Sequence, residues 1–182
     1  MARTARSAAD SGIYHVMHRG VNREIIYRED ADNERFLATL AVVKRLSGCS
    51  VLGYCLMSNH FHLLLRTGGE PLGRLMHRLG VRYACWFNHK YGRVGHVFQN
   101  RFTSIPVEDD PYFVTLVGYI WNNPVRAGIV THPMDYGWNS ALRVSPSGSS
   151  ITTSWRRCFP LRTRRSTSPQ VWFRIRRRSA VW

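Results

Sequence analysis

The sequence has few of the features that define disulfide-stapled, secreted or membrane-spanning proteins. Its four cysteines show neither a CxxC pair nor regular spacing, which indicates free thiols and disfavours a zinc site. The longest apolar stretch, Tyr112 to Trp121, has about half the length needed to span a bilayer. The first ten residues are small and polar, without the apolar region of a secretory signal. We therefore expect a soluble, cytoplasmic protein with no membrane partner.

Acidic residues are also scarce, with 11 Asp and Glu against 26 Lys and Arg and a net charge of +15. All of the acids and 16 of the cations lie in residues 1–140, whereas residues 141–182 carry the other ten cations and no acid. An excess of this sign predicts an anionic partner, although the first part is only mildly basic. We predict one domain over residues 12–142 and a basic, disordered tail over 143–182. Translation of a shifted reading frame is an equally good interpretation of that tail.

The pattern of apolar residues and helix-terminating signals predicts a series of alternating elements. They are a strand at 13–19, a helix from about 30 to 46, a hairpin at 49–66 that turns at 58–59, a helix from 71 to about 89, an extended segment within 94–107 and a helix from 108–111 to 122–123. Pro124 is expected to break the last helix. The order is that of the ferredoxin-like split βαβ pattern. We predict an α+β fold, an antiparallel sheet with helices packed on one face, plus an additional helix.

The segment His60-Phe61-His62 carries the strongest chemical signal. In a strand, residues two apart point to the same face, so both imidazoles project together while Phe61 enters the opposite layer. Two ring nitrogens side by side form half of a metal site. A bare pair of this kind is more often an ordinary surface or core pair. Here it follows a polar turn and precedes three leucines, 63–65, which anchor it in a central strand.

A second signal lies on the helix that follows Pro111. Tyr119 and Asn123 are four residues apart and therefore share one face of that helix. Alone, this pair fits a helix-end tyrosine with a capping asparagine. Combined with the two histidines, it predicts a site in which His60, His62 and Asn123 are metal ligands and Tyr119 is the nucleophile.

These groups suit the cleavage of a phosphodiester bond. A divalent ion polarises a non-bridging phosphate oxygen and stabilises the charge that develops during attack. The phenol of Tyr119 has an ordinary pKa of roughly 10, so it needs a nearby metal or basic group to become phenolate. The product is a phosphotyrosine link, which stores the energy of the broken bond and allows rejoining without ATP.

Four sequence blocks together resemble one known family. The blocks are YHVMHRG at 14–20, MSNHFHLL at 57–64, GHVFQNRF at 95–102 and YIWNNPVRAG at 119–128. They resemble the signature blocks of the REP-associated tyrosine transposases, members of the HUH superfamily of single-tyrosine, IS200-like transposases. The resemblance covers roughly residues 12–142, in the right order and spacing. Four blocks in that arrangement are specific, whereas His-Phe-His alone is not.

The resemblance implies a ferredoxin-like HUH nuclease domain with a catalytic helix. His60 and His62 match the two histidine ligands of the family, Tyr119 matches the catalytic tyrosine, and Asn123 matches the third, polar ligand. The implied metal is Mg²⁺ or Mn²⁺. By ligand preference alone, two imidazoles suit Mn²⁺ or Zn²⁺ better than Mg²⁺, so phosphate and water oxygens would complete the shell of magnesium.

Five further side chains are candidates for contact with DNA, because arginine binds phosphates and base edges and tryptophan stacks on unpaired bases. They are Arg19, Arg23, Arg101, Arg126 and Trp121. For each arginine, a solvated or salt-bridged surface position is an equally good interpretation. His15 and His18 are three residues apart on a strand and face opposite sides, so we do not expect them to be ligands.

The sequence thus predicts a metal-dependent single-stranded DNA transposase that cleaves and rejoins DNA at hairpin-flanked sites through a 5′-phosphotyrosine intermediate. Two alternatives stay open: an HUH nickase for replication or plasmid transfer, and a non-catalytic hairpin-DNA-binding protein of the same fold. The expected partner is single-stranded or hairpin DNA, bound by a monomer or a homodimer. The sequence departs from the family after residue 142, which leaves any DNA-binding role of the tail in doubt.

Overall fold

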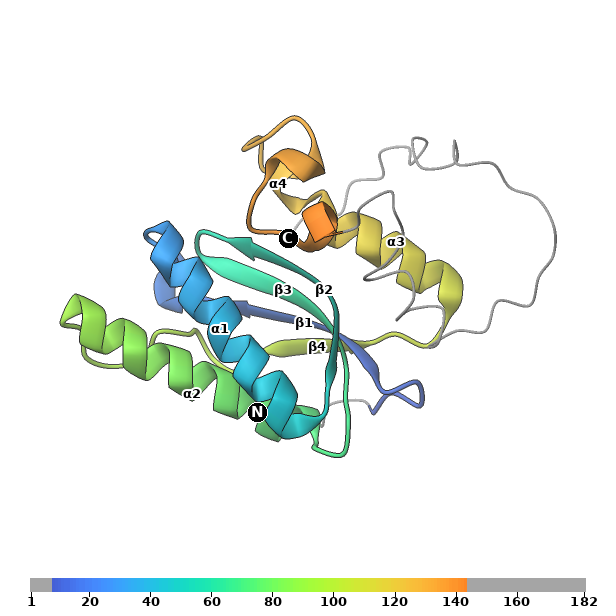
Figure 1. Ribbon diagram of the computed structural model, residues 1–182, viewed down its shortest axis with the longest axis horizontal. Helices are drawn as coiled ribbons and strands as arrows, with labels where there is room; N and C mark the ends of the chain where they lie inside the picture. Colours follow the sequence, from blue (N-terminus) through green and yellow to red (C-terminus); the bar gives the residue numbers. More distant parts are fainter. Residues whose placement is uncertain (1–7, 144–182) are drawn as a thin grey trace.

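In the computed structural model, which describes residues 8–143, four strands form one sheet in the order β2-β3-β1-β4 (Figure 1). The strands are β1 (Ile13–Arg19), β2 (Ser50–Met57), β3 (His60–Arg66) and β4 (Thr103–Pro106). The helices are α1 (Asp30–Ser47), α2 (Leu72–Tyr91), α3 (Asp110–Trp121) and α4 (Asn123–Arg126), with short 3-10 turns η1 (Val21–Arg23), η2 (Pro133–Asp135) and η3 (Ser140–Arg143). Within this part of the chain, no helix has the length and apolar content to cross a membrane.

Two βαβ units interleave in the sheet. Every neighbouring pair of strands is antiparallel, so β1 and β2 run in the same direction with β3 between them. Likewise β3 and β4 run in the same direction, with β1 between them. This arrangement confirms the predicted ferredoxin-like α+β fold. The predicted tail, 143–182, lies outside the described residues apart from its first residue.

Helices α1 and α2 cover one face of the sheet (Figure 1). Helix α1 begins at a capping box between Glu29 and Asp32 and ends at Gly48, whose φ of 66° is readily adopted by glycine. Helix α2 buries an apolar stripe against the sheet, and the Tyr83 hydroxyl donates to the Ile26 carbonyl at 2.5 Å. The stripe consists of Leu72, Leu75, Met76, Leu79, Tyr83 and Phe87.

Helix α3 covers the opposite face, where Phe113, Leu116 and Ile120 pack against the sheet (Figure 1). The helix begins at Asp109, whose side chain accepts a hydrogen bond from the Tyr112 amide at 2.7 Å. It ends at Trp121, which is earlier than the predicted break at the proline. Pro124 instead occupies the first turn of α4, where its missing N–H would have no helical partner in any case.

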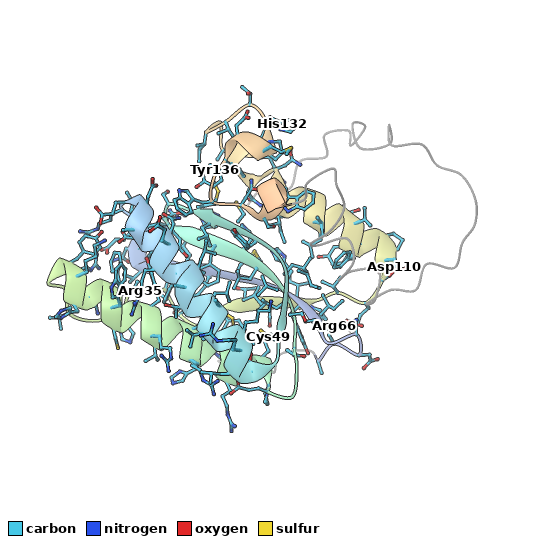
Figure 2. All side chains as sticks on the ribbon, in the orientation of Figure 1. Arg35, Cys49, Arg66, Asp110, His132 and Tyr136 are labelled. Carbon is cyan, nitrogen blue, oxygen red and sulfur yellow. The ribbon has the colours of Figure 1, made fainter. Side chains whose placement is uncertain are left out.

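The chain after α4 returns to the free edge of β2 and covers it. The Leu56 amide donates to the Trp138 carbonyl at 2.9 Å. Tyr136, labelled in Figure 2, lies in this segment, and its hydroxyl donates to the Leu56 carbonyl at 2.7 Å. Farther along, the Tyr54 amide donates to Ser140 Oγ at 3.0 Å. A covered edge strand cannot pair with another chain, so this segment protects the sheet and holds α3 and α4 beside β2 and β3.

Candidate active site

Strand β3 presents His60 and His62 on the face of the sheet that α3 covers. Successive residues alternate between the two layers: Phe61 and Leu63 lie in the core under α1 and α2, whereas Leu64 lies in the core under α3. The ring centroids of the two histidines are 5.2 Å apart. His62 is only 4% exposed and His60 is half-buried, so the pair lies at the edge of the α3 core, with His60 nearer to solvent.

A chain of hydrogen bonds fixes the tautomer of His60. The side-chain nitrogen Nδ2 of Asn59 donates to the Arg23 carbonyl at 3.1 Å, so Asn59 Oδ1 is the atom turned towards His60. His60 Nδ1 lies 2.7 Å from that oxygen, which can only accept. His60 therefore carries its proton on Nδ1, and the lone pair on Nε2 is available. An outer partner that holds a histidine in this way is the usual support of a metal ligand.

His62 has a different partner, the imidazole of His15 on the neighbouring strand. His15 Nε2 lies 3.0 Å from His62 Nδ1, and both side chains are buried. One of these two nitrogens donates and the other accepts. If His62 Nδ1 donates, the lone pair of His62 Nε2 is available to a metal. If His15 donates, Nε2 of the neutral His62 ring carries the proton instead.

Burial keeps all three imidazoles uncharged near neutral pH. It lowers the pKa of His15 to about 4 and, together with the charge of Arg19, that of His60 to about 4. Burial and the neighbouring His15, His60 and Arg19 lower the pKa of His62 to about 3. A neutral imidazole has one N–H and one lone pair, so each ring can offer one nitrogen as a ligand or acceptor.

Tyr119 projects from α3 beside these histidines. Its ring centroid is 5.8 Å from that of His62 and 6.2 Å from that of His15, in edge-to-face arrangements. The side chain is 37% exposed, so solvent or a substrate reaches it. The Arg126 guanidinium lies 5.0 Å from the centroid of the Tyr119 ring. This cation holds the ring by a cation–π contact and adds positive charge next to the phenol.

Asn123 lies one turn beyond Tyr119, at the start of α4. Its Nδ2 donates to the carbonyls of Tyr119 at 3.0 Å and Ile120 at 3.3 Å, which caps the end of α3. The same bonds leave the amide oxygen Oδ1 as the atom that can bind a cation. Helix α4 packs beside β2, the strand next to β3. The role of Asn123 as a third ligand stays a prediction.

The donor set fits a hard divalent ion better than a zinc–thiolate site. Within residues 8–143, no three His, Cys, Asp or Glu side chains converge to hold a metal ion. Cys55 faces His62 across the ladder, but burial raises the pKa of its thiol to about 12, so it is a poor ligand. The two imidazole nitrogens would need oxygen ligands to complete a metal shell, and an amide oxygen such as that of Asn123, with phosphate and water, would give a set suited to Mn²⁺ or Mg²⁺.

The structure separates the five predicted DNA-contact residues. Arg19 is the ladder partner of His60 and is exposed, and Arg126 covers the Tyr119 ring. Arg23 is exposed, and its backbone carbonyl accepts a hydrogen bond from the Asn59 side chain. Arg101 lies elsewhere, on the rim of a pocket next to α2. Trp121 is half-buried and donates through Nε1 to Ser140 Oγ at 2.9 Å, which gives it a structural role in this state.

Comparisons with known proteins identify the family and the fold of the chain. A family model described as IS200-like transposase matches residues 8–123, which contain both histidines, Tyr119 and Asn123. The solved structure of a REP-associated tyrosine transposase bound to a REP hairpin has a TM-score of 0.69 and 19% identity, covering 84% of this chain and 90% of that one. A candidate transposase from Deinococcus radiodurans R1 has a TM-score of 0.47 and 16% identity, covering 66% and 97%. No curated protein sequence matches significantly.

Proposed function

Because the chain belongs to the family of IS200-like transposases, we propose that it cleaves and rejoins single-stranded DNA with Tyr119 as the nucleophile. The observation that carries this proposal is the position of Tyr119. Its ring is accessible and lies 5.8 Å from the ring of His62, one of two histidines that fit a metal site. A phenol beside a metal-bound phosphate is arranged for attack on phosphorus.

In the cleavage step, the phenolic oxygen of Tyr119 forms a bond to phosphorus and the bond from phosphorus to the preceding 3′ oxygen breaks. The phenolic proton passes to solvent, and the leaving oxygen takes up a proton to become a 3′ hydroxyl. The DNA downstream then carries a 5′-phosphotyrosine link. Rejoining is the reverse reaction with the same or another 3′ hydroxyl, so it consumes no ATP.

The side chains around Tyr119 have separate roles in this reaction. His60, His62 and Asn123 would hold a divalent ion, Mg²⁺ or Mn²⁺. When bound, the ion supplies charge stabilisation at the non-bridging phosphate oxygens. Arg126 orients the phenol ring and stabilises the phenolate as the proton leaves. The nucleophile and the histidines belong to the same chain, so a monomer contains every group named.

The substrate we propose is a single strand next to a DNA hairpin. The solved structure with a TM-score of 0.69 is described as bound to a REP hairpin, and this chain shares its fold. The predicted DNA contacts at Arg19 and Arg23 lie next to His60 and Asn59, where a strand held at the metal would pass. They supply positive charge for phosphates on that side of the site.

The test is the formation of a covalent adduct between the full-length protein and a labelled strand that contains a hairpin. With Mn²⁺ or Mg²⁺, a labelled band should appear at the mass of protein plus DNA on a denaturing gel. Tyr119→Phe should abolish the adduct and keep hairpin binding. Tyr112→Phe is the matched control, because Tyr112 is on the same helix with the same 37% exposure. Hairpin binding without any wild-type adduct would instead favour a non-catalytic binding protein.

A further inference from the structure

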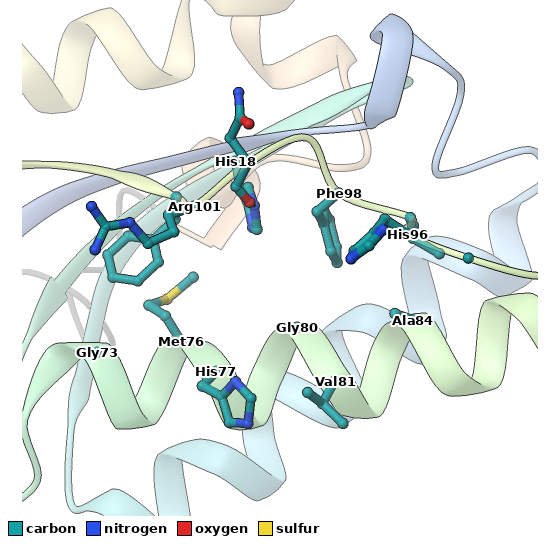
Figure 3. Close-up of a pocket in the computed structure, with 14 residues that line it drawn as sticks. His18, Gly73, Met76, His77, Gly80, Val81, Ala84, His96, Phe98 and Arg101 are labelled. Atoms are coloured by element: carbon teal, nitrogen blue, oxygen red, sulfur yellow. The ribbon is translucent and has the colours of Figure 1, made fainter. Parts of the chain in front are cut away.

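A pocket of about 420 Å³ lies between α2 and the segment 95–102, on the face of the sheet opposite to His60 and His62. In Figure 3, Arg101 stands at one end of this pocket and His96 at the other, with Met76 and Phe98 between them. The block of residues 95–102 was one of the four sequence blocks, yet the proposed reaction leaves it without a role.

Small residues on α2 create the hollow. Gly73, Gly80 and Ala84 line the pocket from one side of the helix. A Cβ atom added at Gly73 would meet no other atom within 4 Å, and one added at Gly80 would come 4.0 Å from the Phe98 ring. Larger residues at these positions would fill the space, so the pocket depends on their absence.

The opposite wall is held in place by hydrogen bonds rather than left mobile. The Asn88 side chain on α2 donates to the Gly95 carbonyl at 2.8 Å, and the Gln99 amide donates to the Arg19 carbonyl at 2.8 Å. Asn100 has a φ of 54°, a left-handed conformation that turns the chain towards Arg101. A wall fixed before binding lowers the entropic cost of holding a ligand.

The lining combines flat or apolar groups with positive charge. Phe98 stacks on His18 with ring centroids 4.4 Å apart, and the half-buried Phe102 adds a second phenyl ring. His96 and Arg101 are exposed at the rim, and none of the lining residues is acidic. Aromatic surfaces next to cationic groups are the features with which proteins bind unpaired bases and their phosphates.

The pocket lies at the same end of the sheet as His60. The segment that forms its wall pairs with the end of β1, at Gly20 and Phe98, and the other side of β1 pairs with β3, at Arg19 and His60. Two strand spacings therefore separate the wall from His60, roughly 10 Å. A single strand held at the histidines can reach the pocket by crossing this end of the sheet.

We propose that this pocket binds one unpaired nucleotide of the DNA strand, with the base between α2 and the rings of residues 96–102 and a phosphate at Arg101. The inference rests on the proposed function for its ligand class, and it assigns a base-binding site away from the cleavage chemistry. Such a site would set the position of the strand relative to Tyr119.

The experiment compares two probes in the presence of EDTA, so that cleavage plays no part. Fluorescence anisotropy measures the affinity of the full-length protein for a short oligo-dT and for an abasic strand of equal length. Wild type should bind oligo-dT roughly tenfold more tightly, as expected for base stacking. Gly73→Leu should fill the pocket and bring this ratio close to one, while binding to the abasic strand stays unchanged. Gly73→Ala, the matched control, should keep the ratio.

Folding of these variants is not at risk, because leucine and alanine both favour a helix more than glycine does. A thermal melt checks this directly. Arg101→Ala should lower the affinity for both strands by the same factor, since phosphate contacts do not depend on the base. The proposal would be overturned if Gly73→Leu kept the tenfold preference for oligo-dT over the abasic strand. It would also be overturned if this variant lost affinity for both strands equally.

A second measurement locates the base. A strand containing 5-iodouracil, irradiated with the wild-type protein, should crosslink to peptides that contain residues 73–84 or 95–102. Crosslinks found only on other peptides would contradict the assignment. The two proposals fail separately. If the wild-type protein forms the adduct but shows no preference for oligo-dT over the abasic strand, the pocket proposal alone fails. If the wild-type protein shows the preference but forms no adduct, the cleavage proposal alone fails.

Discussion

His15 and His62 share a hydrogen bond of 3.0 Å between Nε2 of the first ring and Nδ1 of the second. The direction of this bond decides whether His62 can bind a metal through Nε2. Only when His15 accepts does His62 carry its proton on Nδ1 and leave Nε2 as a lone pair. His15 then has the role of an outer partner that sets the tautomer of a ligand, as Asn59 does for His60.

This relationship predicts different behaviour for two substitutions of His15. In His15→Gln, the side-chain oxygen can still accept from His62, so Mn²⁺ affinity should stay near that of wild type. His15→Leu removes the acceptor, and the affinity should fall by roughly 10- to 100-fold. Electron paramagnetic resonance of free Mn²⁺ measures the affinity without DNA. The ¹⁵N chemical shifts of His62 report the tautomer directly.

The control for this comparison is His89→Leu, because His89 is exposed on α2, away from the histidine cluster. It should leave both Mn²⁺ affinity and the His62 shifts unchanged. Equal losses in His15→Gln and His15→Leu would show that His15 acts through packing alone.

The short distance between Tyr119 and His62 predicts that one chain performs cleavage. Tyr119→Phe lacks the nucleophile and His60→Ala lacks a ligand, so neither variant should form an adduct alone. A mixture of the two should also form none if each site uses its own tyrosine. If subunits of a dimer exchanged their helices, the mixture would recover about a quarter to a half of the wild-type activity, by the statistics of random subunit pairing. Adduct yield on a denaturing gel distinguishes the two outcomes.

The arrangement of strands and helices could be predicted from the sequence because local signals mark each element. The apolar spacing of α2, the turn at 58–59 and the proline and acids before α3 are all readable within a few residues. Alternation along β3 also shows that His60 and His62 share a face. The order of elements along the chain predicted the split βαβ fold, and the similar solved structure has the same fold.

The position of His15 could not be predicted in the same way. His15 and His18 face opposite sides of β1, so they cannot form a pair of metal ligands. The same alternation nevertheless leaves His15 on the face of the sheet that carries His62. Only the register of β1 against β3, which pairs Met17 with His62, brings the two rings together. Register between strands that are distant in sequence depends on the whole core. For the same reason the contact of Trp121 with Ser140 was missed.

Gly20, directly after β1, is a position where a single methyl group should disturb the site. A Cβ atom there would lie 2.3 Å from the Glu24 carbonyl oxygen and 2.8 Å from Ile26 Cγ2. Gly20→Ala must therefore move the turn that includes Arg23, whose carbonyl orients Asn59. We expect the free energy of unfolding to fall by about 1–3 kcal/mol and Mn²⁺ affinity to fall with it.

Chemical denaturation and the Mn²⁺ titration check the two effects of Gly20→Ala. The matched control is Gly69→Ala, because a Cβ at Gly69 meets nothing within 4 Å. That variant should stay within about 0.5 kcal/mol of wild type. A Gly20→Ala protein as stable as the control would mean that the turn adjusts without cost.

Asp32 should make the stability of the domain depend on pH in the acidic range. Its carboxylate is 0% exposed and accepts from the Arg28 amide at 2.7 Å, the Tyr91 hydroxyl at 2.8 Å and the Lys90 ammonium. Burial alone would raise the pKa of Asp32. The hydrogen bonds from Lys90, Tyr91 and the backbone amides of Arg28 and Glu29 outweigh burial and lower the pKa below 3.8. These bonds join the start of α1 to the end of α2.

Asp32→Asn replaces an acceptor of several hydrogen bonds with an amide that has one oxygen, so the free energy of unfolding at pH 7 should fall by about 1–3 kcal/mol. The lowered pKa of Asp32 stabilises the folded state above the ordinary value of 3.8, and that stabilisation is lost as the pH falls through the lowered pKa. The difference between wild type and Asp32→Asn should therefore be constant near neutrality and shrink in acid below that value. Urea denaturation over a pH series measures it, with the exposed Glu34→Gln as the control on the same helix. A difference that is the same at all pH values would mean that Asp32 contributes through packing and not through its charge.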